Sequence, residues 1–287
     1  MKKVLITGSS GMLGSHVCDA IDKSKYQMIC PNRDEFDLKN ILNIARKIKD
    51  IKPDMILHFA AETNVDLCEV DTGHAYLVNS LATETIARTA KEIGAWMVYI
   101  STSNVFGFQK QLFYNELDLP NPVNYYGKSK LAGERTVQQH LPTSSLIIRS
   151  GWMVGGGAKK DHKFVGKIIE QIKKGAQVLR AVNDKYGTVT FAYSLASFIV
   201  KSMDEERIGL YHFASQGLVT RFDIAKMVAE FAGFKGSIKH ASSSEFPLPA
   251  PRPDSEGIVS VVLSAENDLS LLSEDMRQYV SQFDIIR

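Results

Sequence analysis

The sequence predicts an α/β protein with a doubly wound parallel sheet and a smaller C-terminal region. Through the first half of the chain, short apolar runs alternate with longer segments of helical period, which is the pattern of βαβ units. A glycine-rich turn directly follows the first apolar run. The second half loses this regularity and contains a glycine run at 155–157 and a proline-rich stretch at 246–253.

The composition fits a globular protein of one large or two modest domains. Of the 287 residues, 44% are hydrophobic and 23% are charged, and 34 basic against 32 acidic residues leave a formal charge of +2. Nucleic acid is therefore not expected as a partner, and the apolar runs are too short to cross a membrane. An apolar strand begins at Val4, which leaves no space for a secretory leader, and Cys18, Cys30 and Cys68 lack a metal-binding spacing. We expect a cytoplasmic protein with reduced thiols.

The elements of the first half follow one another in a regular order. The predicted strands span residues 4–7, 27–30, 55–59, 96–101 and 146–149. The predicted helices between them span residues 12–22, 41–50, 75–93 and 125–140. Gly94 ends the third helix, and Lys91 in its last turn suits the negative end of the helix dipole. Right-handed crossovers place these helices on both faces of the sheet.

The chain is predicted to divide near residue 152. Residues 1–152 are expected to hold the cofactor and the catalytic groups, and 153–287 mainly form a substrate-binding region, from which segments such as 185–214 rejoin the sheet. Within the second region, Thr220 and Asp223 have the spacing of a capping box, with Asp in place of Glu. A helix is therefore expected to begin there.

A glycine-rich loop connects the first strand to the first helix. It reads Thr-Gly-Ser-Ser-Gly-Met-Leu-Gly over residues 7–14. Gly8 permits the tight turn, Gly11 lets a pyrophosphate approach the backbone, and Gly14 allows the helix to pack closely on the strand. The helix N-terminus then faces the anion. This context predicts a Rossmann-like dinucleotide site, with cofactor contacts from Gly8, Ser10, Gly11, Met12, Leu13 and Gly14.

The residues after the second strand bear on the choice between NADPH and NADH. Proteins that bind NAD usually place an acid there to meet the ribose 2′-hydroxyl, whereas this chain has Asn32 and Arg33. Arg33 could pair with a 2′-phosphate, which favours NADPH while leaving NADH possible. The alternative is a solvated arginine with Asp34 or Asp37 nearby. Asp37, followed by Leu38, is the better placed to meet the adenine.

A tyrosine and a lysine form the main catalytic candidate. Tyr126 and Lys130 stand at i and i+4, so both side chains lie on one face of a helix. A nearby ammonium lowers the pKa of a phenol, so Lys130 could tune Tyr126 as a general acid while holding the nicotinamide ribose. By itself the pair is common on helix surfaces. Thr102 at the end of an intervening strand, behind a dinucleotide loop, makes chance a poor explanation.

With these residues the sequence resembles the extended short-chain dehydrogenase/reductases, and more narrowly the dTDP-4-dehydrorhamnose reductases. The resemblance extends over most of the chain. Its most specific motifs are Ala60-Ala61-Glu62-Thr63-Asn64-Val65-Asp66 and Tyr126-Gly127-Lys128-Ser129-Lys130-Leu131-Ala132-Gly133-Glu134.

The resemblance implies an NADPH-preferring reduction at C4 of a nucleotide-linked 4-keto-6-deoxy sugar, as in dTDP-rhamnose and polysaccharide biosynthesis. Tyr126 would protonate the developing C4 alkoxide, and Thr102 would hydrogen-bond it. Lys130 would lower the pKa of Tyr126 while the cofactor delivers hydride.

Further contacts are implied by the same resemblance. The implied cofactor contacts are Ala60, Ala61, Thr63 and Asn79. The implied substrate contacts are Thr63, Val65, Thr102, Ser103, Asn104, Trp152 and Arg252. Asn79 could equally be a helix-surface or capping amide. Trp152 would offer a flat apolar face to the sugar or belong to the core. Arg252 would meet the substrate diphosphate or anchor the proline-rich loop.

Several positions depart from the family pattern. Ser103 and Asn104 stand where the family has Asp-Tyr, and 150–153 read Ser-Gly-Trp-Met in place of Thr-Ser-Trp-Val. We infer that the sugar, its stereochemistry or its nucleotide differs. His16 and Tyr193 occupy glutamate positions of the Mg²⁺-linked dimers in the family, so no metal is expected. A monomer and a homodimer both remain open.

Two alternative functions share this scaffold. A nucleotide-sugar 4-epimerase needs little beyond the hydroxyl, the tyrosine, the lysine and a tightly held NAD, although Arg33 in place of an acid argues against it. A non-catalytic NADP-binding regulatory subunit is compatible with the altered sugar-facing positions. Because Thr102, Tyr126 and Lys130 occur together, the sequence favours an enzyme. His58 is predicted to be a core histidine rather than a ligand.

Overall fold

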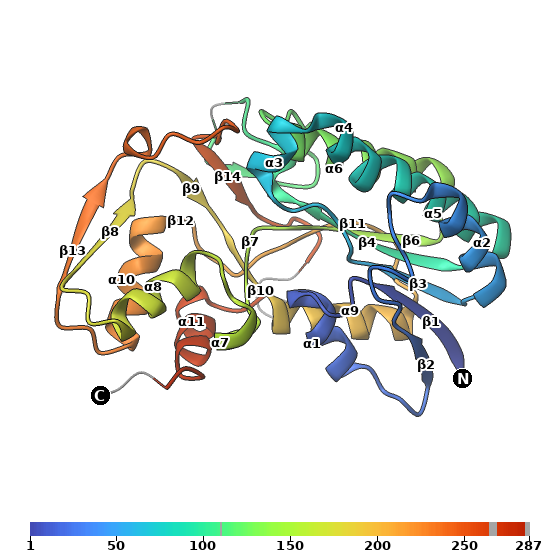
Figure 1. The fold of residues 1–287 in the computed structure, drawn as a ribbon, viewed down its shortest axis with the longest axis horizontal. Helices are drawn as coiled ribbons and strands as arrows, with labels where there is room; N and C mark the ends of the chain where they lie inside the picture. Colours follow the sequence, from blue (N-terminus) through green and yellow to red (C-terminus); the bar gives the residue numbers. More distant parts are fainter. Residues whose placement is uncertain (110, 264–268, 285–287) are drawn as a thin grey trace.

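A six-stranded parallel sheet forms the centre of the larger lobe (Figure 1). The computed structural model describes residues 1–109, 111–263 and 269–284. In spatial order the strands are β11 (Gly209–Phe213), β6 (Ser145–Ser150), β4 (Trp96–Thr102), β3 (Met55–His58), β1 (Lys2–Thr7) and β2 (Tyr26–Ile29). The strand order reverses at β1, which confirms the predicted doubly wound, Rossmann-like fold.

The five predicted strands are all present, and their ends differ from the prediction by at most two residues. The sixth, β11, comes from the second half of the chain and pairs in parallel with β6. It follows α9 (Ala192–Glu205), which packs on α1 (Met12–Ala20). The segment from Ala192 to Phe213 therefore returns to the large sheet.

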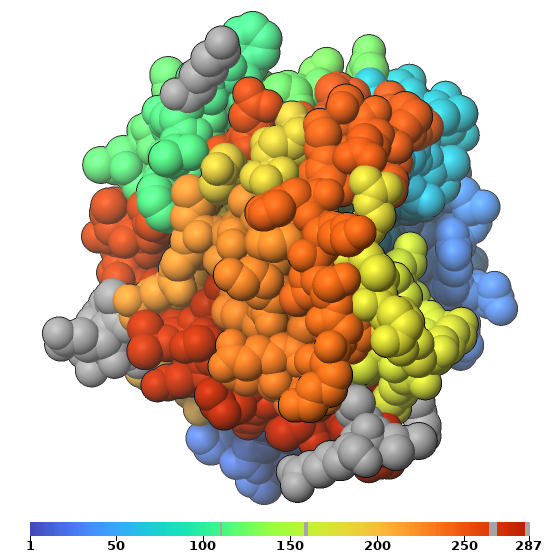
Figure 2. Space-filling view, turned by 90° about the vertical axis from the view of Figure 1, so that its left-hand side faces the viewer, coloured from blue at the N-terminus to red at the C-terminus, as the bar shows by residue number. Residues whose placement is uncertain are grey.

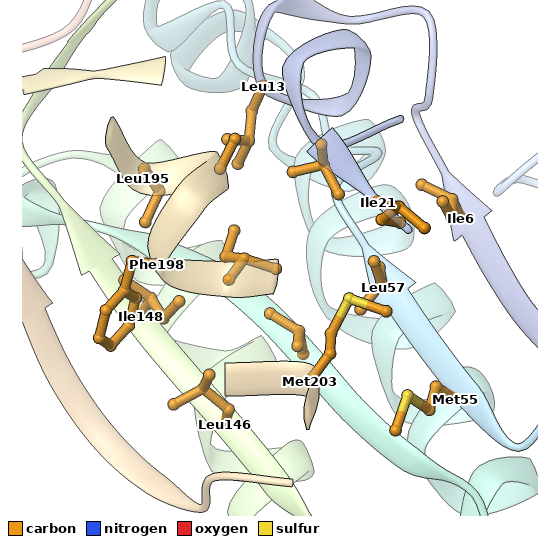
Figure 3. Packing of buried hydrophobic residues seen from close by; sticks show 14 of the residues in the cluster. Ile6, Leu13, Ile21, Met55, Leu57, Leu146, Ile148, Leu195, Phe198 and Met203 are labelled. Atoms are coloured by element: carbon orange, nitrogen blue, oxygen red, sulfur yellow. The ribbon is translucent and has the colours of Figure 1, made fainter. Parts of the chain in front are cut away.

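Helices cover both faces of the sheet because its strands are apolar on both sides (Figure 1). In β1, Val4 and Ile6 point toward α1 and α9, whereas Leu5 points toward the opposite layer. That layer contains α2 (Ile41–Ile51), α5 (Ala82–Ile93) and α6 (Tyr125–His140). Figure 3 shows the core between the sheet and the layer of α1 and α9, where the labelled residues include Ile6, Leu57, Ile148, Leu195, Phe198 and Met203.

The helix predicted over 75–93 is interrupted, so this prediction is wrong in part. Its first section is α4 (Thr72–Tyr76), which is followed by a π-helical turn at Leu77–Leu81 and then by α5. A π-turn admits an extra residue and often marks a functional region. Here it carries the buried Asn79, whose side chain bonds a neighbouring loop. The predicted end at Gly94 is confirmed by its left-handed conformation, with φ 74°.

The second lobe packs small sheets against helices (Figure 1). Its helices are α7 (Gly157–Lys160), α8 (Phe164–Lys173), α10 (Arg221–Phe231) and α11 (Leu272–Val280). Its strand pairs are β8 (Val178–Val182) with β13 (Ser237–Ala241), and β7 (Trp152–Val154) with β10 (Val189–Phe191). Figure 2 views this lobe end-on, with the orange segments of α10 and β13 across its surface. The predicted capping box at Thr220 and Asp223 is confirmed at the start of α10.

A four-stranded mixed sheet lies beside the second lobe. In spatial order it contains β12 (Val219–Thr220), β9 (Tyr186–Gly187), β14 (Ser255–Ile258) and β5 (Phe113–Tyr114). The short helix α3 (Val65–Val70) and the 3₁₀ turn Ser103–Val105 complete the surroundings of the site. The mixed sheet matters for function because β14 brings a late segment of the chain against the turn that follows β4.

His58 is a core histidine, as predicted. It is 2% exposed and lies between the hydroxyls of Thr7, at 2.7 Å, and Thr83, at 3.2 Å. Burial lowers the pKa of His58 from 6.5 to about 3, and the charge of Lys130 acts in the same direction. The folded chain therefore keeps this imidazole neutral at pH values where the unfolded chain protonates it.

This difference predicts a measurable acid sensitivity. Stability from the neutral His58 is fully present above pH 6.5 and is lost as the pH falls toward about 3. In urea unfolding over that interval, the free energy of unfolding of the wild type should fall more steeply than that of His58→Gln, by up to about 1.4 kcal/mol per pH unit. The exposed His162→Gln is the control and should keep the wild-type slope. Equal slopes for wild type and His58→Gln would contradict the assignment.

Candidate active site

One large cavity lies at the carboxyl ends of the parallel strands. Its volume is about 870 Å³, and it extends from the glycine loop to residues of the second lobe. This size and place are typical of ligand sites in doubly wound sheets. Most residues predicted to bind cofactor or substrate line it, including Ala60, Ala61, Thr63 and Val65 on the segment after β3.

The glycine loop fits the pyrophosphate of a dinucleotide. Gly8 has φ +69°, and a Cβ there would lie 2.7 Å from the backbone nitrogen of Ala60. A Cβ at Gly14 would lie 2.2 Å from the carbonyl oxygen of Gly8, so only glycine allows α1 to start so close to the loop. Gly11 caps α1 without a side-chain acceptor, and the first turn carries no acid. The positive end of the helix therefore faces the cavity, and all six predicted loop residues line it.

The predicted adenosine end is lined by Asn32, Arg33, Asp37 and Leu38. The side-chain oxygen of Asn32 accepts from two backbone N–H groups of its own turn, at 2.9 and 3.0 Å, so it orders the loop. Arg33 is exposed, and no carboxylate in the described ranges lies within ion-pair distance of it. Its guanidinium can therefore meet a ligand without first breaking a salt bridge.

The proposed catalytic side chains meet where β4 ends and α6 begins. Tyr126 and Lys130 of α6 and Thr102 of β4 all line the cavity. Two glycines allow α6 to lie this close to β4: a Cβ at Gly127 would be 2.1 Å from the carbonyl oxygen of Asn104, and one at Gly133 would be 2.4 Å from a tyrosine hydroxyl. Gly127 and Gly133 thus allow the close approach that brings Tyr126 beside Thr102.

Burial shifts the pKa values of Tyr126 and Lys130, and one of the two shifts differs from the prediction. Burial raises the pKa of Tyr126 above its ordinary value, and a hydrogen bond with Thr102 opposes that rise. The net shift of the Tyr126 pKa is therefore upward, opposite to the predicted lowering, and burial is its largest cause. The ammonium of Lys130 lies 4.1 Å from the ring centre of Tyr99, and burial lowers its pKa to about 7. Tyr126 keeps its proton at neutral pH.

Two predicted contact residues do not line the cavity. Asn79 is buried, and its amide bonds the backbone N–H of Glu62 at 2.9 Å, the carbonyl of Glu62 at 3.0 Å and the hydroxyl of Ser129 at 3.1 Å. It holds a loop of the site in place. Ser103 is also buried, because its hydroxyl donates to Glu256 at 2.7 Å. For both residues, direct contact with cofactor or substrate stays a prediction.

Trp152 and Arg252 line the cavity with much of their surface already engaged. The guanidinium of Arg221 lies 3.8 Å from the indole centre, so a cation covers one face of the ring. Contact of the ring with the sugar stays a prediction. Arg252 donates to Asp66 at 3.0 Å and to the carbonyl of Ala250 at 2.7 Å, and thus ties the proline-rich loop to α3. Both residues combine a structural contact with a place on the cavity wall.

Sequence reasoning missed several charged residues of this cavity. Glu256, Arg221 and Lys163 line it, although they lie on β14, at the start of α10 and before α8. No local motif marks them as ligand-facing. The one available signal was the replacement of Asp by Ser103 in the family pattern, which could have prompted a search for a carboxylate elsewhere in the chain.

Three expectations about cysteines, metals and membranes can be compared with the structure. Cys18, Cys30 and Cys68 are free thiols. Among the described residues, no group of three or more His, Cys, Asp or Glu side chains is arranged to hold a metal ion. In the same part of the chain, no helix has the length and apolar character that a bilayer crossing needs.

Similarity to known proteins agrees with this geometry. Residues 1–282 match the family described as the RmlD substrate binding domain. The chain is also 33% identical over 246 residues to the dTDP-4-dehydrorhamnose reductase of Salmonella typhimurium. The aligned region covers 82% of this chain and 81% of that protein. The chain belongs to the dTDP-4-dehydrorhamnose reductase family. It is an NAD(P)-dependent oxidoreductase of the extended short-chain dehydrogenase/reductase type.

Solved structures of this reductase family share the whole architecture. A dTDP-4-dehydrorhamnose reductase from Yersinia enterocolitica has a TM-score of 0.96 at 49% identity, covering 99% of this chain and 100% of that one. The enzyme from Bacillus anthracis, solved in complex with NADP, has a TM-score of 0.89 at 28% identity, covering 98% and 99%. The Bacillus subtilis spore coat polysaccharide biosynthesis protein SpsK is 31% identical over 254 residues, covering 88% of this chain and 87% of that protein.

Proposed function

We propose that this reductase uses NADPH to reduce the C4 keto group of a nucleotide-linked 4-keto-6-deoxy sugar, with Tyr126 as the proton donor. The observation that carries the proposal is that Thr102, Tyr126 and Lys130 all line the cavity that begins at the glycine loop. The names of the reductase relatives support the substrate class. The NADP complex of the Bacillus anthracis enzyme supports the cofactor.

The residues of the chain suit this reaction. The glycine loop and Lys130 would hold the nicotinamide cofactor, which supplies the hydride when bound. Tyr126 and Thr102 donate hydrogen bonds to the keto oxygen, and these strengthen as the oxygen gains negative charge. Tyr126 then transfers its proton to that oxygen and completes the alcohol. Its phenolate is stabilised by the positive charge of Lys130 and regains a proton from solvent.

Positive charge at the other end of the cavity suits the substrate diphosphate. Arg221, Arg252 and Lys163 line that end. Arg252 is partly neutralised by Asp66, whereas Arg221 has no carboxylate within ion-pair distance among the described residues. A guanidinium fork matches the geometry of phosphate oxygens. Placed cations therefore explain how a chain with a net charge of only +2 would take an anionic substrate.

Preference for NADPH is assigned to Arg33. Replacing it in Arg33→Ala removes a charge-assisted contact with the 2′-phosphate, so the Kd for NADPH should rise roughly tenfold or more. The Kd for NADH should change less than twofold, because NADH lacks that phosphate. Fluorescence titration with both cofactors measures the effect. Arg46→Ala, on the exposed side of α2, is the matched control. Equal changes for the two cofactors would remove the argument for 2′-phosphate selection.

A substrate panel tests the function as a whole. Nucleotide-linked 4-keto-6-deoxy sugars that differ in base and in sugar stereochemistry are incubated with NADPH or NADH, and cofactor absorbance and product configuration are followed. We expect oxidation of NADPH in preference to NADH, with at least one sugar reduced at C4. Oxidation of neither cofactor across the panel would overturn the reductase proposal. Epimerised product without net cofactor use would favour a 4-epimerase, and a stoichiometric co-purifying partner would favour a regulatory subunit.

A further inference from the structure

A single buried carboxylate joins two walls of the active site. Glu256, on β14, is 6% exposed. Its Oε1 accepts from the indole Nε1 of Trp152 at 2.7 Å. Its Oε2 accepts from the hydroxyl of Ser103 at 2.7 Å and from the side-chain amide of Asn104. The two oxygens therefore face different elements, one on β7 and the other on the turn after the catalytic strand β4.

The hydrogen bonds continue from this turn to the catalytic helix. The side-chain oxygen of Asn104 accepts from the amide of Asn124 at 3.1 Å. Asn124 caps α6 by accepting from the backbone N–H of Gly127 at 2.9 Å, in the first turn that also carries Tyr126. Thr102 accepts from the backbone N–H of Asn104 at 3.2 Å. The position of Glu256 is thus linked to both proposed hydrogen-bond donors of the reaction.

The indole held by Glu256 is fixed on other sides as well. The guanidinium of Arg221 stacks 3.8 Å from its centre, and a Cβ at Gly187 would lie 2.5 Å from its ring atoms. Arg221 and Glu256 also attract each other electrostatically. Trp152 can therefore keep one orientation only while the carboxylate, the cation and the glycine backbone remain in place.

We propose that Glu256 is a positioning residue for sugar reduction. It fixes Trp152 and the Ser103–Asn104 turn in place relative to Tyr126. This inference rests on the proposed function. A carboxylate suits the task because both of its oxygens accept hydrogen bonds. A glutamine of the same shape accepts at one oxygen and would turn its NH₂ toward donors. Either the hydrogen bond from Trp152 or those from Ser103 and Asn104 would then be lost.

The first test compares Glu256→Gln with a surface control. Because misplacement by about 1 Å can cost roughly 100-fold in rate, we expect kcat/KM for the sugar nucleotide to fall by about that factor. The Kd for NADPH should stay within twofold of wild type, because no cofactor-loop residue contacts Glu256 among the described residues. Glu245→Gln, an exposed acid paired with Arg180 in the second lobe, should leave both quantities unchanged. A kcat/KM for Glu256→Gln within twofold of wild type would overturn the proposal.

A second variant tests whether Glu256 acts through Trp152. Trp152→Phe retains an aromatic ring but removes the N–H that Glu256 holds. If the two residues act through one contact, their effects are not additive, and the double variant should be about as impaired as the worse single variant. Strictly additive losses would contradict a shared role.

A substrate-free readout separates this inference from the proposed function. The chain has two tryptophans, so subtracting the fluorescence spectrum of Trp152→Phe from that of the parent protein isolates Trp152. In Glu256→Gln this difference spectrum should shift to the red, because the released indole meets more water. An unchanged spectrum would show that Glu256 does not hold Trp152, even if the substrate panel succeeds. A shifted spectrum, together with no cofactor oxidation by any sugar of the substrate panel, would reject only the proposed reaction.

Discussion

Tyr126→Phe should reduce kcat for sugar reduction by about 10²–10⁴-fold, the range typical for loss of a general acid. The substitution removes the hydroxyl that is hydrogen-bonded to Thr102 and keeps the ring and its packing in α6. NADPH binding should remain near wild type, because the glycine loop and Arg33 are untouched. Steady-state kinetics and a separate cofactor titration measure the two effects.

The preceding residue provides a matched control. Tyr125 is also a phenol at the start of α6, but its ring lies beneath Lys128, with the ammonium 4.4 Å from the ring centre. Tyr125→Phe should therefore retain turnover. If Tyr126→Phe were as active as Tyr125→Phe, the proton would have to come from another group.

Glu134→Ala should lower the free energy of unfolding by about 3–5 kcal/mol, the usual cost of leaving one partner of a buried ion pair. Glu134 is 1% exposed and Arg149 is 3% exposed. Two hydrogen bonds join them: Nε to Oε1 at 2.9 Å and Nη2 to Oε2 at 2.7 Å. The pair links α6 to β6, so its loss leaves a charged guanidinium inside the large lobe without its carboxylate.

Chemical denaturation followed by circular dichroism tests this stability difference. Glu170→Ala is the control, because Glu170 pairs with Lys174 on an exposed helix surface, where such pairs contribute only about 0.3–0.5 kcal/mol. The melting temperature of Glu134→Ala should fall by roughly 10 °C, given about 2–4 °C per kcal/mol for a chain of this size. Similar stability of the two variants would show that the buried pair contributes little.

The cofactor half of the site was largely predictable because its determinants are local. The glycine loop needs only its spacing between a strand and a helix, and Gly8, Gly11 and Gly14 line the cavity as expected. Tyr126 and Lys130 lie on one helix by their i, i+4 spacing, and Thr102 ends a strand. Each of these relations extends over a few residues, so propensity and periodicity suffice to predict it.

The substrate half was less predictable because it is assembled by contacts distant in sequence. Asn79 was expected near the cofactor, but a π-turn directs its amide to Glu62 and Ser129. Trp152 was predicted either to offer a flat face to the sugar or to belong to the core. Neither alternative indicated its contact with Arg221, on a helix that begins 69 residues later in the chain. The periodicity of a sequence carries no information about such partners.

The sequence by itself determined the doubly wound sheet, the glycine loop between β1 and α1, and the spacing of the three residues proposed as catalytic, because backbone geometry imposes those spacings locally. Only the tertiary structure decided the direction in which the pKa of Tyr126 shifts, because burial of the side chain raises it. It also decided which carboxylate accepts the hydrogen bonds of Ser103 and Asn104. Glu256 reaches that turn from β14, more than 150 residues away, because the mixed sheet brings the two segments together.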